Sequence, residues 1–175
     1  MALLVSVRSA PPDSPAAWRR LCAAFVTGAI ACMGNWTVVV ALPAVEREFG
    51  SARAGASFPY ALAMIGFASG TLILGRLADR FGVVALILLS AVLLGAGYAL
   101  SAAAPSLMAF ALAHLLVGFG ASAGFGPIID DISHWFTARR GLAVVLVAAG
   151  NYVSGAFWPV LLQRLTEDYG WRAAH

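Results

Sequence analysis

The sequence has no lysine, and charged side chains of any kind are scarce in it. Only 11% of its 175 residues are charged, against roughly a quarter in ordinary globular proteins, while 61% are hydrophobic. A water-soluble domain of this size could not cover its surface with so few charges. The eleven basic residues are all arginines. They lie singly or in pairs between apolar runs, which excludes the basic face that nucleic-acid binding requires. The composition indicates an integral membrane protein.

Several kinds of chemical site are also missing. The only two cysteines, Cys22 and Cys32, lie ten residues apart in one apolar run. This spacing excludes a disulfide within a single helix, and nothing nearby could complete a metal site. No Gly-x-x-x-x-Gly-Lys phosphate loop is present, so an ATP-driven mechanism is not supported. We therefore expect no metal and no cofactor.

Five apolar stretches are long enough to cross a bilayer. A helix that spans the bilayer needs about 20 residues. Only helices and closed β-barrels pair all their backbone groups in lipid, and the sequence lacks the alternation of a barrel strand, so helices are expected. The stretches cover residues 21–42, 58–77, 83–104, 107–129 and 142–162. The sequence therefore predicts an all-α integral membrane fold with five transmembrane helices. Residues 1–20, which contain three prolines, are expected to form a disordered cytoplasmic tail. Residues 164–175 are expected to form an outer loop.

The arginines also predict an orientation in the membrane. If the N-terminus is cytoplasmic, seven arginines lie inside and four outside. The inner set is Arg8, Arg19, Arg20, Arg76, Arg80, Arg139 and Arg140, and the outer set is Arg47, Arg53, Arg164 and Arg172. The positive-inside rule then favours a cytoplasmic N-terminus. We expect a multi-pass protein of the cell inner or plasma membrane, with the lipid bilayer as its first partner.

Small residues recur at four-residue spacing within the spans. The pairs are Ala24 and Gly28, Gly66 and Gly70, and Gly120 and Gly124. Such spacing lets helices approach closely in lipid, where packing drives their association.

The loop between the second and third spans carries both charge signs. It reads Gly75-Arg76-Leu77-Ala78-Asp79-Arg80-Phe81-Gly82. Gly75 permits close contact at a helix end and Gly82 permits a tight turn. Asp79 could accept backbone N–H groups at the start of a neighbouring helix. A plain salt-bridged turn explains the same residues equally well.

This loop resembles the signature loop of the major facilitator superfamily. In span four, His114 to Ala121 resembles the family pattern Arg-x-x-x-Gly-x-Gly-Ala, with His in place of Arg. Residues 135–155, which include Trp135-Phe136 and Arg139-Arg140, resemble the monocarboxylate-transporter and oxalate-exchanger branch. Val145 and Val147 depart from that pattern, which prefers small residues there.

The resemblance implies an architecture and a function. Members have twelve spans in two six-helix halves, each half built from inverted three-helix repeats. The chain would then be five helices of an incomplete N-terminal half, with the C-terminal half as a missing partner. The implied function is secondary active transport of a small solute by alternating access, with an organic anion or monocarboxylate and coupled protons as the leading expectation. The chain is not expected to be an enzyme.

Two alternatives to an active transporter remain open. One is a truncated membrane protein that does not transport, such as a stub or the product of a pseudogene. The other is a five-span membrane enzyme, which would need acids or His/Asp pairs within the membrane. His114 is the only ionisable side chain well inside a span.

Polar side chains within spans are the candidate solute and proton sites. They are His114, Asn35, Asn151 and Tyr152. His114 lies on the order of 10 Å from the outer end of its span at 1.5 Å per residue, and Asn35 falls at a similar depth. Protonated His114 could bind an anion or carry the coupling proton. The alternative for His114 is a neutral imidazole hydrogen-bonded between helices, and Asn151 and Tyr152 could equally serve helix packing.

The connection between spans four and five places Asp130 and Asp131 beside Ser133 and His134. This grouping superficially resembles a hydrolytic or metal cluster. Arg139 and Arg140 follow closely, and we interpret the segment as a salt-bridged cytoplasmic loop.

Overall fold

The computed structural model describes residues 11–50 and 57–175. The first span consists of two helices, α1 (Pro15–Ala31) and α2 (Met33–Phe49), which meet at Cys32. The predicted tail ran to residue 20, whereas α1 begins at Pro15. Ser14 caps the helix by accepting the N–H of Ala17 at 3.3 Å, and Pro15 suits the first helical position. Residues 1–10 of the predicted tail lie outside the described residues.

The rest of the described chain is helical too. Its elements are α4 (Phe58–Phe81), α5 (Val83–Ala102), α6 (Leu107–Ala121), η2 (Ser122–Gly124), α7 (Gly126–Ser133), α8 (Arg140–Tyr169) and α9 (Trp171–Ala174). Within residues 11–50 and 57–175 there is no strand, and five helical stretches are long and apolar enough to cross a membrane. The predicted all-α fold with five spans is confirmed. The predicted outer loop instead continues α8 to Tyr169 and turns into α9 at Gly170, whose φ of +84° suits glycine.

Helix α6 packs along both α4 and α5. Glycines bring α4 and α6 into backbone contact. A methyl group added to Gly118 would overlap the carbonyl of Ala63, and one added to Gly66 would overlap the carbonyl of Leu115. In lipid such close packing is a principal source of helix association. These three helices therefore form a tightly joined layer.

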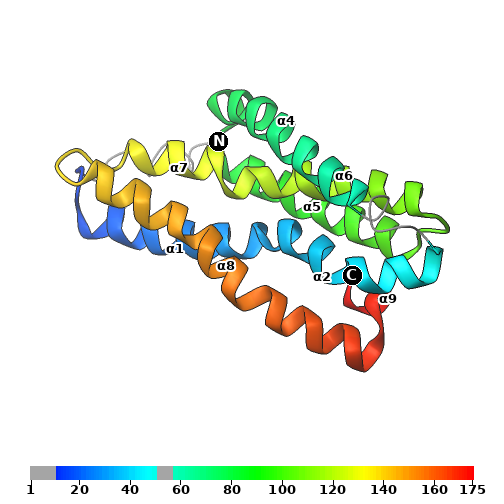
Figure 1. Cartoon of the computed structure of the whole chain (residues 1–175). Helices are drawn as coiled ribbons and strands as arrows, with labels where there is room; N and C mark the ends of the chain where they lie inside the picture. The colour runs from blue at the N-terminus through cyan, green and yellow to red at the C-terminus, as the bar shows by residue number, and fades with distance from the viewer. Residues whose placement is uncertain (1–10, 51–56) are drawn as a thin grey trace.

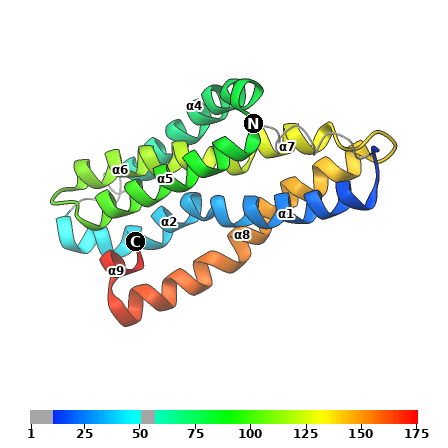
Figure 2. The same cartoon turned by 180° about the vertical axis from the view of Figure 1, so that it is seen from behind.

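Helix α8 crosses the first span and contacts both α1 and α2. Figures 1 and 2 show its last part diverging from α2, with α9 turning back toward α2. Aromatic side chains mark this interface. The indole of Trp36 lies against Gly155, and Trp158 Nε1 donates to the carbonyl oxygen of Ala29 at 2.8 Å.

The first and fourth spans are both interrupted, and they cross at their interruptions. The fourth span changes from α6 to η2 and then to α7. A methyl group added to Gly124, in η2, would overlap the Cβ of Ala31, and one added to Gly28 would lie 2.9 Å from the carbonyl oxygen of Gly124. A mainly apolar hollow of about 160 Å³ borders the crossing.

Candidate functional site

His114 is fully buried on α6. Its Nδ1 lies 3.0 Å from the carbonyl oxygen of Phe110, one turn earlier. Because a carbonyl only accepts, Nδ1 carries the hydrogen, and in the neutral ring Nε2 is then a bare acceptor. His114 Nε2 is buried and has no hydrogen-bond partner among the described residues. The backbone satisfies one ring nitrogen and leaves the other for a proton or a ligand.

Asn35 and Asn151 also place polar atoms inside the bundle. The Oδ1 atoms of both are buried, as are Trp36 Nε1 and Ser154 Oγ, and none has a hydrogen-bond partner in the part of the chain that the structure describes. Asn35 and Trp36 come from α2, whereas Asn151 and Ser154 come from α8. Buried polar groups are normally paired, so unpaired ones on facing helices suit a site that binds something polar.

The structure does not join all four predicted polar residues into one contact cluster. Gly34, the neighbour of Asn35, packs against Val117, one helical turn beyond His114. No hydrogen bond joins the Asn35 and His114 side chains. Tyr152 is 77% exposed on the outer side of α8, so it lies away from the buried polar atoms of this chain.

Further residues near His114 were missed by the sequence analysis. The ring of His175 lies 5.5 Å from that of His114 and 5.9 Å from that of Tyr98, measured between centroids. The Tyr98 hydroxyl is 3.0 Å from Thr37 Oγ1. Tyr98 lies inside an apolar run, and His175 lies in the segment that the sequence analysis assigned to an outer loop. Nothing in the sequence distinguishes His175 from His134 as the histidine that lies near His114.

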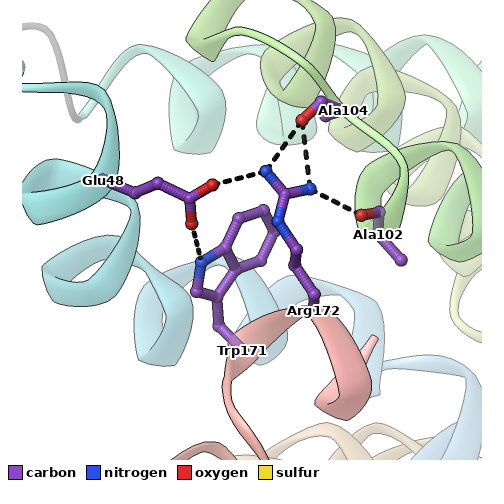
Figure 3. Close-up of polar contacts among 5 residues, drawn as sticks. All are labelled: Glu48, Ala102, Ala104, Trp171 and Arg172. Atoms are coloured by element: carbon purple, nitrogen blue, oxygen red, sulfur yellow. Dashed lines mark hydrogen bonds and ion pairs between the residues drawn. The ribbon is translucent and has the colours of Figure 1, made fainter.

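A polar cluster holds α9 against α2 and the end of α5 (Figure 3). Glu48 accepts hydrogen bonds from Trp171 Nε1 at 2.7 Å and from Arg172 Nη2 at 2.6 Å. Arg172 also donates to the carbonyl oxygens of Ala102 and Ala104 at the end of α5, at 2.6 to 3.1 Å. A cation at a helix C-terminus is favoured by the helix dipole. We call Glu48, Trp171 and Arg172 the α9 clasp.

The predicted signature loop borders a hollow of about 760 Å³ at the opposite end of the bundle. Its lining includes Asp79, Arg80, Gly82, Asp130 and Asp131. Gly82 has a φ of +82°, the conformation that a turn between α4 and α5 requires here. The carboxylate of Asp79 is exposed and makes no hydrogen bond or ion pair with a described residue. The predicted capping role of Asp79 is therefore not seen within this part of the protein.

The remaining residues of the loop are spread along the helix end. Gly75 has open space where a Cβ would stand, so no close contact forms there with the described residues. Arg76 donates to the carbonyl oxygen of Leu72 at 3.2 Å, and Arg80 lies 5.5 Å from the Phe81 ring centre.

Asp131 pairs with Arg20 of α1 rather than with the nearby arginines 139 and 140. The Arg20 guanidinium meets the carboxylate in a bidentate contact at 2.8 and 2.9 Å, and it also covers the Trp135 ring at 4.7 Å. Arg140 instead donates to Ser133 Oγ at 3.0 Å. The predicted salt-bridged segment is present with a different partner, because α1 begins early enough to bring Arg20 alongside α7.

Asp13 caps the start of α8 from outside that helix. Its carboxylate accepts the N–H groups of Thr137, Ala138 and Arg139 at 3.0 to 3.3 Å, as well as the Thr137 hydroxyl at 3.0 Å. These hydrogen bonds, led by the one from Ala138, hold the pKa of Asp13 below its usual value. Asp13 has a φ of +58° and donates its own N–H to Trp135. We call this arrangement the Asp13 cap.

Comparison with known proteins identifies the family. A family model described as the Major Facilitator Superfamily matches residues 24–175. The chain belongs to this superfamily. The match spans all five apolar helices, and it confirms the resemblance carried by the signature loop and by the segments in spans four and five.

The relatives of this superfamily member include monocarboxylate transporters. Human Monocarboxylate transporter 11 is 29% identical over 170 residues, which cover 94% of this chain and 35% of that protein. Mouse Monocarboxylate transporter 3 is 32% identical over 164 residues, or 93% of this chain and 33% of the relative. An uncharacterized transporter of the superfamily from Escherichia coli is 35% identical over 101 residues, or 57% of this chain and 25% of its own length. The chain spans about a third of the length of the two monocarboxylate transporters.

Proposed function

We propose that the protein containing this chain is a secondary active transporter that moves a small solute across a membrane by alternating access. Membership of the superfamily supports this class of function, and the names of the relatives agree with it. The observation that carries the proposal is the set of buried polar atoms without partners on α2, α6 and α8, which are those of Asn35, His114 and Asn151. Hydrocarbon penalises such atoms, so they are retained where a polar solute passes.

The solute we propose is a small organic anion, most simply a monocarboxylate, moved together with a proton. His114 offers one unpaired ring nitrogen, and an imidazole nitrogen of this kind can take up and release a proton. A protonated imidazole attracts a carboxylate, and Asn35 and Asn151 could each donate an amide hydrogen to one. In this mechanism, proton uptake and anion binding favour each other.

We further propose that the N-terminus faces the cytoplasm of an inner or plasma membrane. The hollow beside Asp79 and Arg80 would then open to the cytoplasm, and the signature loop would act in gating. Transport also requires the partner half that residues 1–175 do not supply, so these residues alone should not move solute.

Uptake by the whole protein in proteoliposomes tests the proposal. We expect accumulation of a labelled monocarboxylate such as lactate when the outside is acidic, and loss of accumulation when a protonophore collapses the gradient. Failure to take up any monocarboxylate over a range of imposed gradients would contradict it. Expression of residues 1–175 alone should give no uptake above empty liposomes.

Substitution of His114 tests its role. His114→Ala should abolish the pH dependence of uptake, whereas His134→Ala should preserve it, since His134 is exposed at the other end of the bundle. Unchanged pH dependence in His114→Ala would reduce His114 to a packing residue.

The signature loop is tested through the transport cycle. Asp79→Asn should slow uptake while leaving membrane insertion intact, because the carboxylate is exposed and supports no contact within the described residues. A wild-type rate in Asp79→Asn would remove Asp79 from the gating mechanism.

A further inference from the structure

His114 and His175 present the same arrangement from two different helices. His114 Nδ1 lies 3.0 Å from the Phe110 carbonyl oxygen, and His175 Nδ1 lies 2.8 Å from the Trp171 carbonyl oxygen. In both cases the carbonyl is one helical turn earlier, and it forces the hydrogen onto Nδ1. Both neutral rings therefore expose a lone pair at Nε2. Two acceptors of this kind have no hydrogen to share.

Neither lone pair finds a donor. The Nε2 atoms of both histidines are buried and have no hydrogen-bond partner in residues 11–50 and 57–175. The rings are 5.5 Å apart and nearly perpendicular, and the Phe110 ring lies 4.2 Å from His114 and 5.8 Å from His175. An aromatic setting offers no competing hydrogen bond. The two Nε2 atoms are not hydrogen-bonded to each other, and one added proton would supply the donor that both lack.

The α9 clasp fixes His175 at this point. Trp171 and Arg172 bind Glu48 of α2, and Arg172 also binds the last carbonyls of α5 (Figure 3). His175 is one turn further along the chain and hydrogen-bonds back to Trp171. Its position against His114 is therefore set by the contacts of α9 with α2 and α5, together with its own hydrogen bond to Trp171.

We propose that His114 and His175 form one proton-binding pair, in which a single proton is held jointly and a second proton is repelled. This inference rests on the proposed transport function and extends it, since it assigns the coupling proton to two residues. The proton binds at Nε2 of one ring, and the neutral Nε2 of the other ring stabilises the resulting imidazolium. Such a pair titrates as a unit.

The other titratable groups around the pair support a single proton. Tyr98 of α5 contacts the His175 ring and is hydrogen-bonded to Thr37. Glu48 of α2 and Arg172 of α9 neutralise each other at 2.6 Å. The pair therefore faces a phenol and a balanced ion pair. No side-chain carboxylate forms an ion pair with either ring among the described residues, so a second imidazolium would lack a side-chain counter-charge.

The test compares His175 variants of the whole reconstituted protein. His175→Phe keeps an aromatic ring against Phe110 and Trp171 but removes the acceptor. The pH midpoint of proton-coupled uptake should fall by about one unit, a tenfold loss of proton affinity, which is the scale of one charge-assisted hydrogen bond. His175→Gln retains an acceptor oxygen and should restore part of the midpoint. Equal midpoints in wild type and His175→Phe would overturn the pair.

A double substitution tests whether the two residues act as a unit. His114→Gln with His175→Phe should be no worse than His114→Gln alone, because the first change already removes the proton site. His134→Phe is the control, since His134 lies at the other end of the bundle. Additive losses from the two changes would mean two independent sites and would contradict the proposal.

A measurement that needs no transport separates this proposal from the transport function. The protein is labelled with ¹⁵N-histidine in lipid nanodiscs, and the His114 ring signals are assigned with His114→Gln. The midpoint of His114 protonation should move about one pH unit lower in His175→Phe. A stationary midpoint overturns the pair even if the protein transports, whereas a shifted midpoint supports it even if lactate is not the solute.

Discussion

The α4–α6 interface and the interface of α8 with the first span are built by different means. Along α4 and α6, glycines let one backbone touch the other, as at Gly118 against Ala63. The α8 interface relies more on polar contacts: the Asp13 cap lies at one end, the α9 clasp at the other, and the Trp158–Ala29 hydrogen bond between them. Between those ends lie buried polar atoms without partners, including those of Asn35 and Asn151.

The difference separates a rigid layer from a working interface. Helices whose backbones are in contact have one favourable packing arrangement, so they move together as a rigid body. An interface held mainly by separate polar contacts can change its packing between them without losing its attachment. Unpaired polar atoms reduce the stability of such an interface, and they are retained where function requires them. We therefore expect substitutions in the first interface to affect folding and those in the second to affect transport.

The largest effect is expected from Gly118→Val. A valine side chain would overlap the Ala63 backbone and force α4 from α6, with a cost of about 3 kcal/mol in the free energy of unfolding. Unfolding of the purified protein by denaturing detergent in mixed micelles would measure the loss.

Gly95→Ala is the matched control for this change. Gly95 lies within α5 and has open space around the position of a Cβ. The substitution should be neutral or stabilising by up to about 1 kcal/mol, because alanine favours helix. Comparable losses in Gly118→Val and Gly95→Ala would mean that backbone contact does not distinguish the α4–α6 interface.

The next largest effect is expected from Asn151→Leu, which should lower transport activity without lowering stability. Leucine has the same branched shape and removes the unpaired Oδ1, so the free energy of unfolding should stay constant or rise by about 1 kcal/mol. Solute uptake should fall at least about tenfold, the equivalent of losing one good hydrogen bond to the solute. Uptake at the wild-type rate would make Asn151 a packing residue.

A smaller effect is expected from Trp158→Phe. The change deletes the hydrogen bond to Ala29 and should cost about 1 kcal/mol of stability. Trp36→Phe removes the same atoms from an indole whose Nε1 has no partner among the described residues. The difference between the two variants measures the hydrogen bond itself. If Trp36→Phe proves the more damaging, packing on Gly155 outweighs the Trp158 bond.

The smallest effect is expected from Asp13→Asn, because the Asp13 cap is exposed to solvent. The lowered pKa of Asp13 means that the cap stabilises the folded protein above the unfolded pKa of about 3.9. That contribution is lost as the pH falls through the lower folded pKa. The stability difference between wild type and Asp13→Asn should thus shrink below about pH 4.

Thermal unfolding in detergent from pH 7 down to pH 3 would measure this difference. Asp168→Asn serves as the control, since Asp168 is exposed on α8 and caps no helix among the described residues. A pH-independent difference between wild type and Asp13→Asn would show that the carboxylate charge is not what stabilises the cap.

The sequence predicts the five spans well, because apolar runs of that length have few other uses. The boundaries and interruptions of the helices are harder to predict from the sequence. The Ser14-Pro15 pair is a helix start signal that the neighbouring prolines obscured. The interruption at Cys32 has no proline to mark it, while Pro43 lies inside α2 without ending the span. Packing between helices determines where these helices begin and where they are interrupted, and the local residue pattern carries no information about that packing.

The candidate site was predicted in part for a similar reason. Asn35, His114 and Asn151 stand out because they are polar within apolar runs, and the structure buries an unpaired polar atom of each. The contacts that join distant segments were not foreseeable. Glu48 and Arg172 are 124 residues apart, as are Asp13 and Thr137. Chain folding alone brings each pair together, and no spacing rule connects them.

The crossing of the first and fourth spans has a mechanical consequence. Two interrupted helices that touch at their interruptions can change the angle between their segments while the contact itself stays in place. Here that contact is between Ala31 and Gly124, and the adjacent hollow of about 160 Å³ leaves room for the segments to move. A small rotation of α2 about this contact would carry Asn35 toward or away from α8 without moving Ala31 from Gly124. The bundle therefore contains a pivot point at the place where its two interrupted spans meet.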